Sequence, residues 1–204
     1  MRSWIWIVLP LWTAACAAAP VAPSSSPPAA EAPTAPAVDP ADARLSAVKE
    51  AVPALAGALK ARLQAAMSDG GPEAAARVCA DEAQAMTKQI ADARGVSVGR
   101  SSLRLRNPAN QGPDWVSAWL TEQGERPAAG VEGFARVDVV GTTRVARVLK
   151  PIPVDALCLT CHGPKETLTE PVRALLAARY PTDAATGYAV GDLRGAVWGE
   201  ATVP

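Results

Sequence analysis

Residues 131–148, VEGFARVDVVGTTRVARV, decide the fold. Val131–Val140 and Thr142–Val148 are both rich in β-forming residues, and Gly141 separates them. Two such runs joined by a short glycine turn predict an antiparallel hairpin. Helical patterns dominate the chain before this hairpin. Helices first and a small antiparallel sheet afterwards indicate an α+β domain.

Helical periodicity begins at the start of the predicted domain. Apolar residues recur three and four positions apart over residues 45–67, which predicts one long helix that ends at Gly70-Gly71. Pro53 lies inside this pattern and is expected to kink the helix. A second helix is predicted from Pro72 to Arg94, with Gly95 as its C-terminal cap.

The elements around the hairpin are less regular. Val96–Leu105 alternates loosely and predicts an extended segment, which Asn107–Asn110 then breaks. A short helix capped by Asp114 is expected next, and a last helix over Glu170–Tyr180. The tail from Pro181 is rich in glycine, so turns are expected there.

A C-x-x-C-H run follows the hairpin. It reads Cys158-Leu159-Thr160-Cys161-His162, and His162 is the only histidine in the chain. Two thiols at this spacing can each form a thioether to one haem edge, and the next histidine is then placed under the iron. The run therefore predicts one covalent haem c, held by Cys158 and Cys161 with His162 as the proximal ligand.

Three other interpretations of this run compete with haem attachment. A zinc site could recruit Cys79 as a fourth ligand, but Cys161 and His162 are adjacent, whereas zinc ligands are usually spaced by two or more residues. A thioredoxin-like redox pair requires a βαβ unit, which the order of elements does not suggest. A plain disulfide leaves His162 without a role. The spacing therefore favours haem.

The N-terminus has the pattern of a secretory signal. Arg2 precedes an apolar stretch over residues 4–12, and small residues then lead to Cys16. This pattern predicts a signal peptide over residues 1–16, whose apolar stretch is shorter than a membrane-spanning helix. Small residues directly before a cysteine resemble a bacterial lipobox, although Thr13 stands where leucine is usual. Cys16 is therefore expected to be lipidated.

The location of the mature chain follows from this signal. Ala17 and Ala18 lack the aspartate that retains bacterial lipoproteins in the inner membrane, so the lipobox resemblance implies a periplasmic protein anchored to the outer membrane. The alternative is ordinary cleavage after Ala15 or Ala18, which would give a soluble periplasmic protein.

Two further parts follow the signal. Residues 17–40 are mostly Ala, Pro and Ser and bury too little apolar surface to fold, so a disordered tether is expected. Residues 41–204 have the size of a single domain. The chain carries 20 basic and 20 acidic residues, which argues against nucleic acid or an anionic surface as a partner. Membrane contact is therefore expected only through the lipid anchor.

Four segments resemble a known family. They are VGRSSLRLRNPAN at residues 98–110, CLTCHG at 158–163, YPTDAATGY at 180–188 and GDLRG at 191–195. In this order, and over roughly residues 70 to 198, the chain is similar to the Tll-like haem domain, a family of single-haem c-type domains.

The resemblance implies a fold and a ligand set. The fold would be PAS-like, with a central antiparallel sheet flanked by helices and, in this chain, a long N-terminal helix. The haem would have histidine on one side and a cysteine thiolate on the other. In the family this cysteine lies on an early helix, in a context like Val78-Cys79 here.

Counting the cysteines gives a separate reason to consider Cys79. The chain has four cysteines, of which Cys16 is removed or lipidated and Cys158 and Cys161 are used as thioethers. Cys79 is left over, and an unpaired thiol is a liability in an oxidising compartment unless it is buried or ligated.

Other assignments of the second axial position remain open. Helical periodicity places Cys79 on one inward face with Ala83, Met86 and Ile90, so it could be an ordinary buried cysteine. Met67 and Met86 are the other soft ligands, although methionine is also common core filler.

Three arginines form a second candidate group. Arg100, Arg104 and Arg106 share one side if the segment is extended, where they could neutralise the haem propionates. The alternative is a solvated strand face, with Arg104 or Arg106 bonded to a loop carbonyl.

These residues predict a haem module that is not an enzyme. It would sense redox state or a small diatomic gas, or carry single electrons, in each case together with a redox or signalling protein. The alternative is a periplasmic haem enzyme such as a peroxidase. Such chemistry needs an acid or base beside the distal position, and no second histidine is available.

Overall fold

The computed structural model describes residues 39–204. The predicted signal peptide, Cys16 and nearly all of the predicted tether lie outside the described residues. The described part forms one compact unit whose first helix begins at Pro40. Within residues 39–204, no helix combines the length and the apolar character that crossing a membrane requires.

A helical hairpin opens the domain. α1 (Pro40–Arg77) continues through a π-helical turn, Val78–Glu82, into α2 (Ala83–Arg94). Gly70 and Gly71 have non-helical backbone angles inside α1, with φ of −148° and 69°, so the predicted break is confirmed. α1 continues in helical conformation through Pro53, so its one break lies at the two glycines. Gly95 caps α2 with a left-handed φ of 59°, as predicted.

Four antiparallel strands form one sheet in the order β1-β4-β3-β2. The predicted hairpin is confirmed as β2 (Phe134–Val140) and β3 (Thr143–Pro153). β4 (Leu193–Thr202) lies in the tail where only turns were expected, and it pairs with both β1 and β3.

The extended segment predicted over Val96–Leu105 is shorter than expected. β1 covers Ser97–Ser101 only. The hydroxyl of Ser102 accepts a hydrogen bond from the Arg104 N–H at 3.1 Å and donates one to the Arg104 carbonyl at 2.9 Å. This local turn competes with strand pairing and ends β1.

The remaining helices are short. α3 (Asp114–Gln123) begins at Asp114, the residue expected to be its cap, and Pro113 takes the cap position instead. α4 (Leu159–His162) carries the second half of the C-x-x-C-H run. The predicted last helix is confirmed as α5 (Glu170–Arg179). Three short 3-10 turns complete the domain: Pro108–Asn110, Ala156–Cys158 and Lys165–Thr167.

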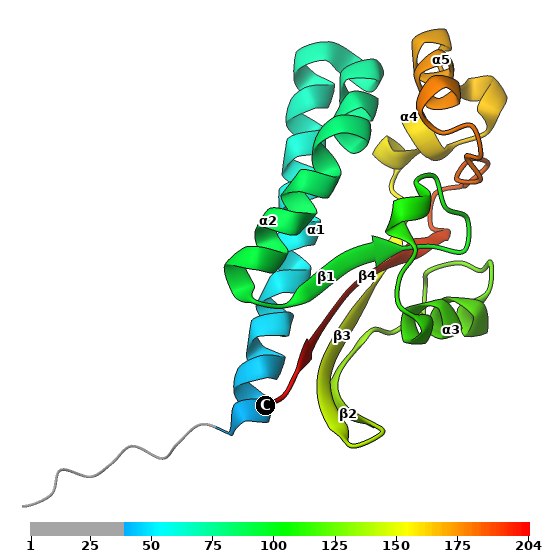
Figure 1. Ribbon diagram of the computed structural model, residues 1–204. Helices are drawn as coiled ribbons and strands as arrows, with labels where there is room; N and C mark the ends of the chain where they lie inside the picture. The colour runs from blue at the N-terminus through cyan, green and yellow to red at the C-terminus, as the bar shows by residue number, and fades with distance from the viewer. Residues whose placement is uncertain (1–38) are drawn as a thin grey trace, which may run out of the picture. The chain divides into compact units, whose positions relative to one another are not determined.

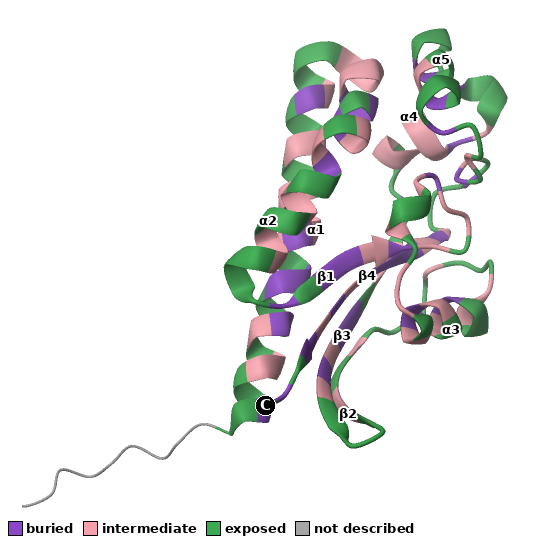
Figure 2. Ribbon diagram, viewed as in Figure 1, coloured by how far each residue is buried: buried purple, intermediate pink, exposed green. Residues whose placement is uncertain are grey.

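The elements pack in layers about the sheet. α1 lies against β3 and β4, and α2 lies beside α1 and reaches β1 (Figure 1). The buried residues follow β1, β4 and the sheet-facing side of α1 (Figure 2). α3 packs through Val116 and Leu120 against Leu149 and Ala196 of the sheet. The predicted α+β fold, an antiparallel sheet flanked by helices with a long N-terminal helix, is confirmed.

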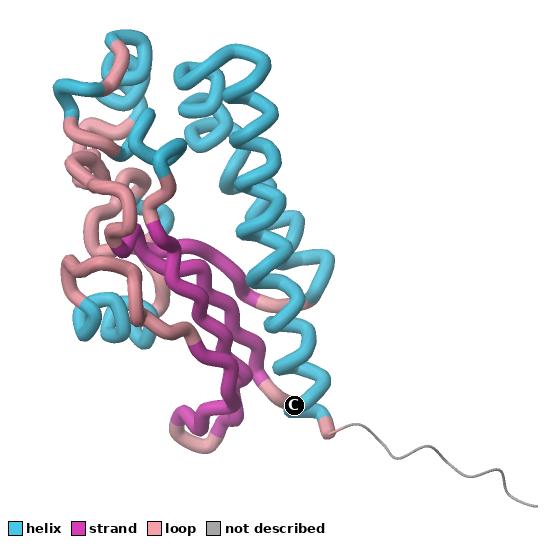
Figure 3. Tube along the Cα trace, turned by 180° about the vertical axis from the view of Figure 1, so that it is seen from behind, coloured by secondary structure: helices cyan, strands magenta, loops and turns pink. Residues whose placement is uncertain are grey.

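The two ends of the described chain lie together. The C-terminus after β4 lies beside the first turn of α1, and α4 and α5 lie at the opposite end of the sheet (Figures 1 and 3). The C-x-x-C-H run is therefore far from both ends of the described chain.

Candidate haem-attachment site

The C-x-x-C-H run lies on one continuous turn that follows β3. Val154 anchors its start, because its N–H donates to the Asp192 carbonyl and its carbonyl accepts from the Gly191 N–H, both at 2.9 Å. A 3-10 turn then carries Cys158, and α4 carries Cys161. Both thiols are half-buried and free, so neither forms a disulfide in the structure.

The His162 ring is fixed by one hydrogen bond. Its Nδ1 lies 2.7 Å from the carbonyl oxygen of Ala185, so Nδ1 carries the proton and donates. This leaves the lone pair of Nε2 available for a metal. Burial lowers the pKa of His162 well below its usual value, and the charges of Arg194 and Arg106 lower it further. The imidazole is therefore neutral, the form that ligates a metal.

Arg106 ties three segments together at this turn. Its Nε donates to Asp183 at 3.0 Å, and its Nη2 donates to the carbonyls of Cys161 at 2.6 Å and Ala185 at 3.1 Å. Its exposed fraction is only 8%. The Ala185 carbonyl that orients His162 is therefore itself positioned by Arg106.

Arg104 is also bonded to a loop. Its Nη1 donates to the Thr186 carbonyl at 3.1 Å, and its guanidinium lies 3.8 Å from the centre of the Tyr188 ring. Arg104 and Arg106 thus have the carbonyl partners that the second interpretation of the arginines predicted. Arg100 lies on β1, and its side chain has no hydrogen bond or ion pair with another described residue.

The three arginines do not continue along one strand face. The prediction that they share one face required an extended segment, and it was wrong. β1 ends at Ser101, and the turn at Ser102 redirects the chain. All three still lie near the motif. The charges of Arg100 and Arg106 both contribute to the lowered pKa of His162, after burial.

Cys79 lies on the π-helical turn, beside the motif. The Tyr180 hydroxyl donates to the Cys79 carbonyl at 3.3 Å. Burial raises the pKa of the Cys161 thiol, and the nearby thiols of Cys79 and Cys158 raise it further. Ala80 and Cys161 both pack against one apolar cluster that joins α5 to the turn before it. Its buried members are Leu168, Val172, Leu176 and Tyr180.

The predicted helix face through Cys79 is only partly correct. Ile90 packs against the core between α1 and the sheet, whereas the neighbour of Cys79, Ala80, packs against the α5 cluster. The π-helical turn adds a residue to one turn of the helix and so shifts the register between these positions. Met67 packs with Ala66 and other residues of the helical hairpin.

Sequence reasoning assigned no role to several residues of this site. Asp183, Tyr188 and Arg194 surround the motif, and all three fall within the segments that carry the family resemblance. Among the described residues, no group of three or more His, Cys, Asp and Glu side chains is arranged to hold a metal ion, as a zinc site would require.

The fold and the site define the class of protein. The described residues form an α+β unit with a C-x-x-C-H turn at the end of its antiparallel sheet, and a buried arginine holds that turn. The family model Tll0287-like matches residues 31–199, and the chain belongs to this family.

One solved structure is similar to this chain. It is the crystal structure of the cyanobacterial heme-protein Tll0287, at 29% sequence identity and a TM-score of 0.46. The match covers 58% of this chain and 67% of that one. No curated protein matches the chain.

Proposed function

We propose that the chain binds one haem c through thioethers from Cys158 and Cys161, with His162 as an axial ligand. The observation that carries this proposal is the set of two free thiols and a neutral imidazole on one turn, with Nδ1 of His162 bonded to the Ala185 carbonyl. Family membership supports it, since a relative is described as a heme-protein.

The residues present fit this chemistry. Each thiol would add its S–H across a vinyl double bond, sulfur to one carbon and hydrogen to the other, so no atom is lost. The bound haem would supply a one-electron redox centre. Arg106 and Asp183 would hold the turn in place, because their bonds reach both the Cys161 carbonyl and the segment that orients His162.

In this proposal Cys79 would supply a second protein ligand to the haem iron. It lies on a π-helical turn, an element that often occurs at functional sites, and this turn lies beside Cys161. A thiolate donates electron density and stabilises ferric iron, so a low reduction potential is expected.

The Cys79 turn could act as a switch. The thiolate would be held less tightly once the site is reduced, and a diatomic gas could compete for the same position. Cys79 would then be released, whereas the ion pairs from Arg62 to Glu82 and from Arg179 to Asp81 would remain. A released π-helical turn can relax into regular α-helix, which provides the second arrangement that a switch requires.

The setting of this switch is also proposed. The protein would act in the periplasm, anchored to the outer membrane through Cys16, and would pass its signal or its electron to another protein. We propose that it is not an enzyme, since His162 is the only histidine and would be consumed as a ligand. Simple one-electron transfer is the second candidate, because it requires the same ligands without the movement.

Hydrogen exchange on ferric and ferrous holoprotein tests the switch. Protection over residues 78–90 is expected to fall on reduction or on carbon monoxide binding, while the β2–β3 hairpin serves as an internal control that does not change. Equal protection in both states, with fast electron exchange with a soluble cytochrome, would instead support an electron carrier. Sustained peroxide turnover would contradict both and support an enzyme.

A further inference from the structure

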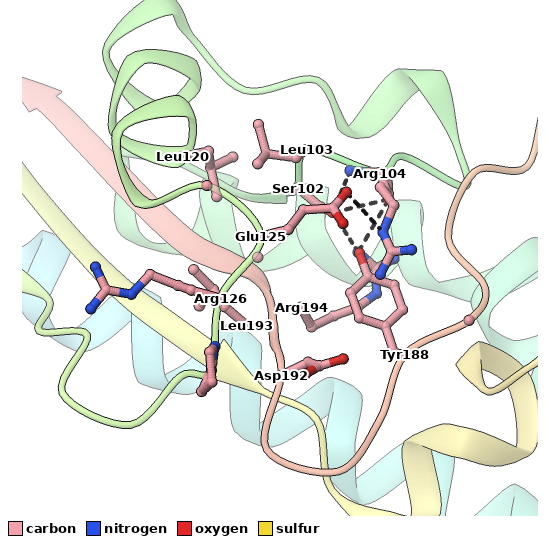
Figure 4. A pocket seen from close by; sticks show the side chains of 14 residues that line it. Ser102, Leu103, Arg104, Leu120, Glu125, Arg126, Tyr188, Asp192, Leu193 and Arg194 are labelled. Carbon is pink, nitrogen blue, oxygen red and sulfur yellow. Dashed lines mark hydrogen bonds and ion pairs between the residues drawn. The ribbon is translucent and has the colours of Figure 1, made fainter.

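A cavity of about 280 Å³ is lined in part by Tyr188, whose ring also meets the His162 ring. Its walls come from the loop after β1, from α3 and the loop that follows it, and from the start of β4 with the loop that precedes it (Figure 4). Leu103, Leu120 and Leu193 give part of this lining an apolar character. Neither cysteine of the motif lines this cavity.

Two guanidiniums dominate the polar part of the lining. Arg104 and Arg194 lie at 3.8 and 5.2 Å from the centre of the Tyr188 ring. The Nη1 of Arg194 donates to the Ser102 hydroxyl at 2.6 Å. Arg126 also lines the cavity, but its side chain extends away from this group (Figure 4).

The charge of these two arginines is incompletely balanced. Arg194 forms no ion pair with any carboxylate of residues 39–204. The Nε atoms of Arg104 and Arg194 are enclosed and have no hydrogen-bond partner among the described residues. Burial lowers the pKa of Arg194 and outweighs Tyr188 and the Asp183 carboxylate, which act in the opposite direction. Enclosed charges in proteins are normally paired.

The two carboxylates in the lining do not supply this balance. Asp192 accepts a hydrogen bond from the Ala189 N–H at 2.8 Å and so caps its own loop. Glu125 lies 3.5 Å from Nε of Arg104, but its side chain is 65% exposed. Glu125 therefore lies at the rim, as a loosely held carboxylate that another could displace.

We propose that this cavity binds a carboxylate group between Arg104 and Arg194, with the attached hydrocarbon against Leu103 and Leu120. Guanidinium matches carboxylate in charge and geometry, and the leucines favour an organic acid over an inorganic anion. The carboxylate has two possible sources, a free organic acid or a propionate of the haem, and the experiment distinguishes them.

A ligand in the cavity would affect the C-x-x-C-H run through Tyr188. The Tyr188 ring meets the His162 ring edge-on, with centres 6.3 Å apart. The Tyr188 ring also contacts both guanidiniums, so a ligand that moves the two arginines would also move the ring that packs against His162.

Calorimetric titration of holoprotein with sodium propionate tests the proposal, with propionamide as an uncharged control ligand. Saturable binding of propionate alone is expected. Arg104→Gln and Arg194→Gln are expected to weaken it about ten- to a hundred-fold, as for a hydrogen bond to a charged group. Arg126→Gln is the matched control and is expected to change affinity less than about three-fold, because its charge points away.

A second variant tests the proposal without changing the enclosed arginines. Glu125→Gln removes the competing carboxylate from an exposed position, so it is expected to fold normally and to bind propionate several-fold more tightly. The same affinity in wild type, Arg194→Gln and Glu125→Gln would overturn the proposal.

A haem propionate as the bound carboxylate would give a different result. If a haem propionate already fills the cavity, added propionate does not bind, but Arg194→Gln shifts the propionate bending mode in the resonance Raman spectrum and Arg126→Gln does not. This outcome would support the carboxylate site and assign its occupant. If added propionate does not bind and no such shift occurs, the cavity is not a carboxylate site.

Discussion

Arg106 is the residue on which the geometry of the site depends most. It bonds to the carbonyl of the second motif cysteine, to the carbonyl that orients His162, and to Asp183. The side chains of Arg106 and Asp183 are only 8% and 11% exposed, so water screens their ion pair little. The position of His162 is thus set by an arginine more than fifty residues away in sequence.

Replacement of Arg106 by alanine is expected to lower the free energy of unfolding by about 3–5 kcal/mol, because Asp183 would be left as an unpaired, enclosed charge. Denaturant unfolding of the holoprotein measures this loss. Arg136→Ala is the control, because the Arg136 side chain is 58% exposed and its ion pair with Asp138 is expected to contribute about 1 kcal/mol or less. Equal losses in the two variants would contradict a special role for Arg106.

The proposed ligand Cys79 gives a separate prediction at this scale. Cys79→Ala is expected to abolish the charge-transfer band and the electron-paramagnetic signature of low-spin thiolate ligation, while the covalent haem remains attached. Absorption and paramagnetic resonance of the ferric protein measure both. Met86→Ala is the matched control and is expected to keep both signals. An unchanged spectrum in Cys79→Ala would make Cys79 a packing residue.

At the scale of elements, glycines shape both the helices and the sheet. A Cβ on Gly199 of β4 would lie 2.8 Å from Val48 and 3.0 Å from Val52, so only glycine lets α1 approach the sheet so closely. Gly57 lies within α1, and a Cβ added there would have no neighbouring atom within 4 Å. The two positions therefore respond in opposite directions to the same substitution.

Gly199→Ala is expected to destabilise the fold by about 1–3 kcal/mol through overpacking between α1 and β4. Gly57→Ala is expected to stabilise it by about 0.5–1 kcal/mol, because alanine is the better helix former. Thermal unfolding of the two variants against wild type measures both signs. Destabilisation by both substitutions would show that α1 does not pack as described.

Local patterns predicted the elements whose signals are local. The helical hairpin with its Gly70-Gly71 break, the β2–β3 hairpin and α5 were all predicted from periodicity and turn residues. β4 was missed because its glycines mimic a turn-rich tail, although Gly199 is required by packing against a distant helix. The end of β1 was missed because a single serine side chain sets it.

In the candidate site, too, local features could be predicted and contacts between distant residues could not. The C-x-x-C-H run is a local motif and was visible in the sequence. The bond from Arg106 to Asp183 joins residues 77 apart, so spacing along the chain carries no sign of it. The π-helical turn at Cys79 is likewise bonded to Tyr180, about a hundred residues away, just after the end of α5.

At the scale of the whole molecule, the site and the chain ends lie at opposite ends of the sheet. α4 and α5 lie at one end, and Pro40 and the C-terminus lie together at the other (Figures 1 and 3). An attachment at the N-terminal end would leave the end with the motif available to a redox or signalling partner. This arrangement suits both the sensor and the electron carrier that we propose.

The mass of the intact mature protein, made in a host with c-type haem maturation, tests the central claim most directly. The account predicts one added haem, with no atom lost, retained after denaturation because the bonds to Cys158 and Cys161 are covalent. Cys158→Ser with Cys161→Ser is expected to lose it on denaturation. An unmodified polypeptide mass for the wild-type protein, with or without bound zinc, would contradict the account.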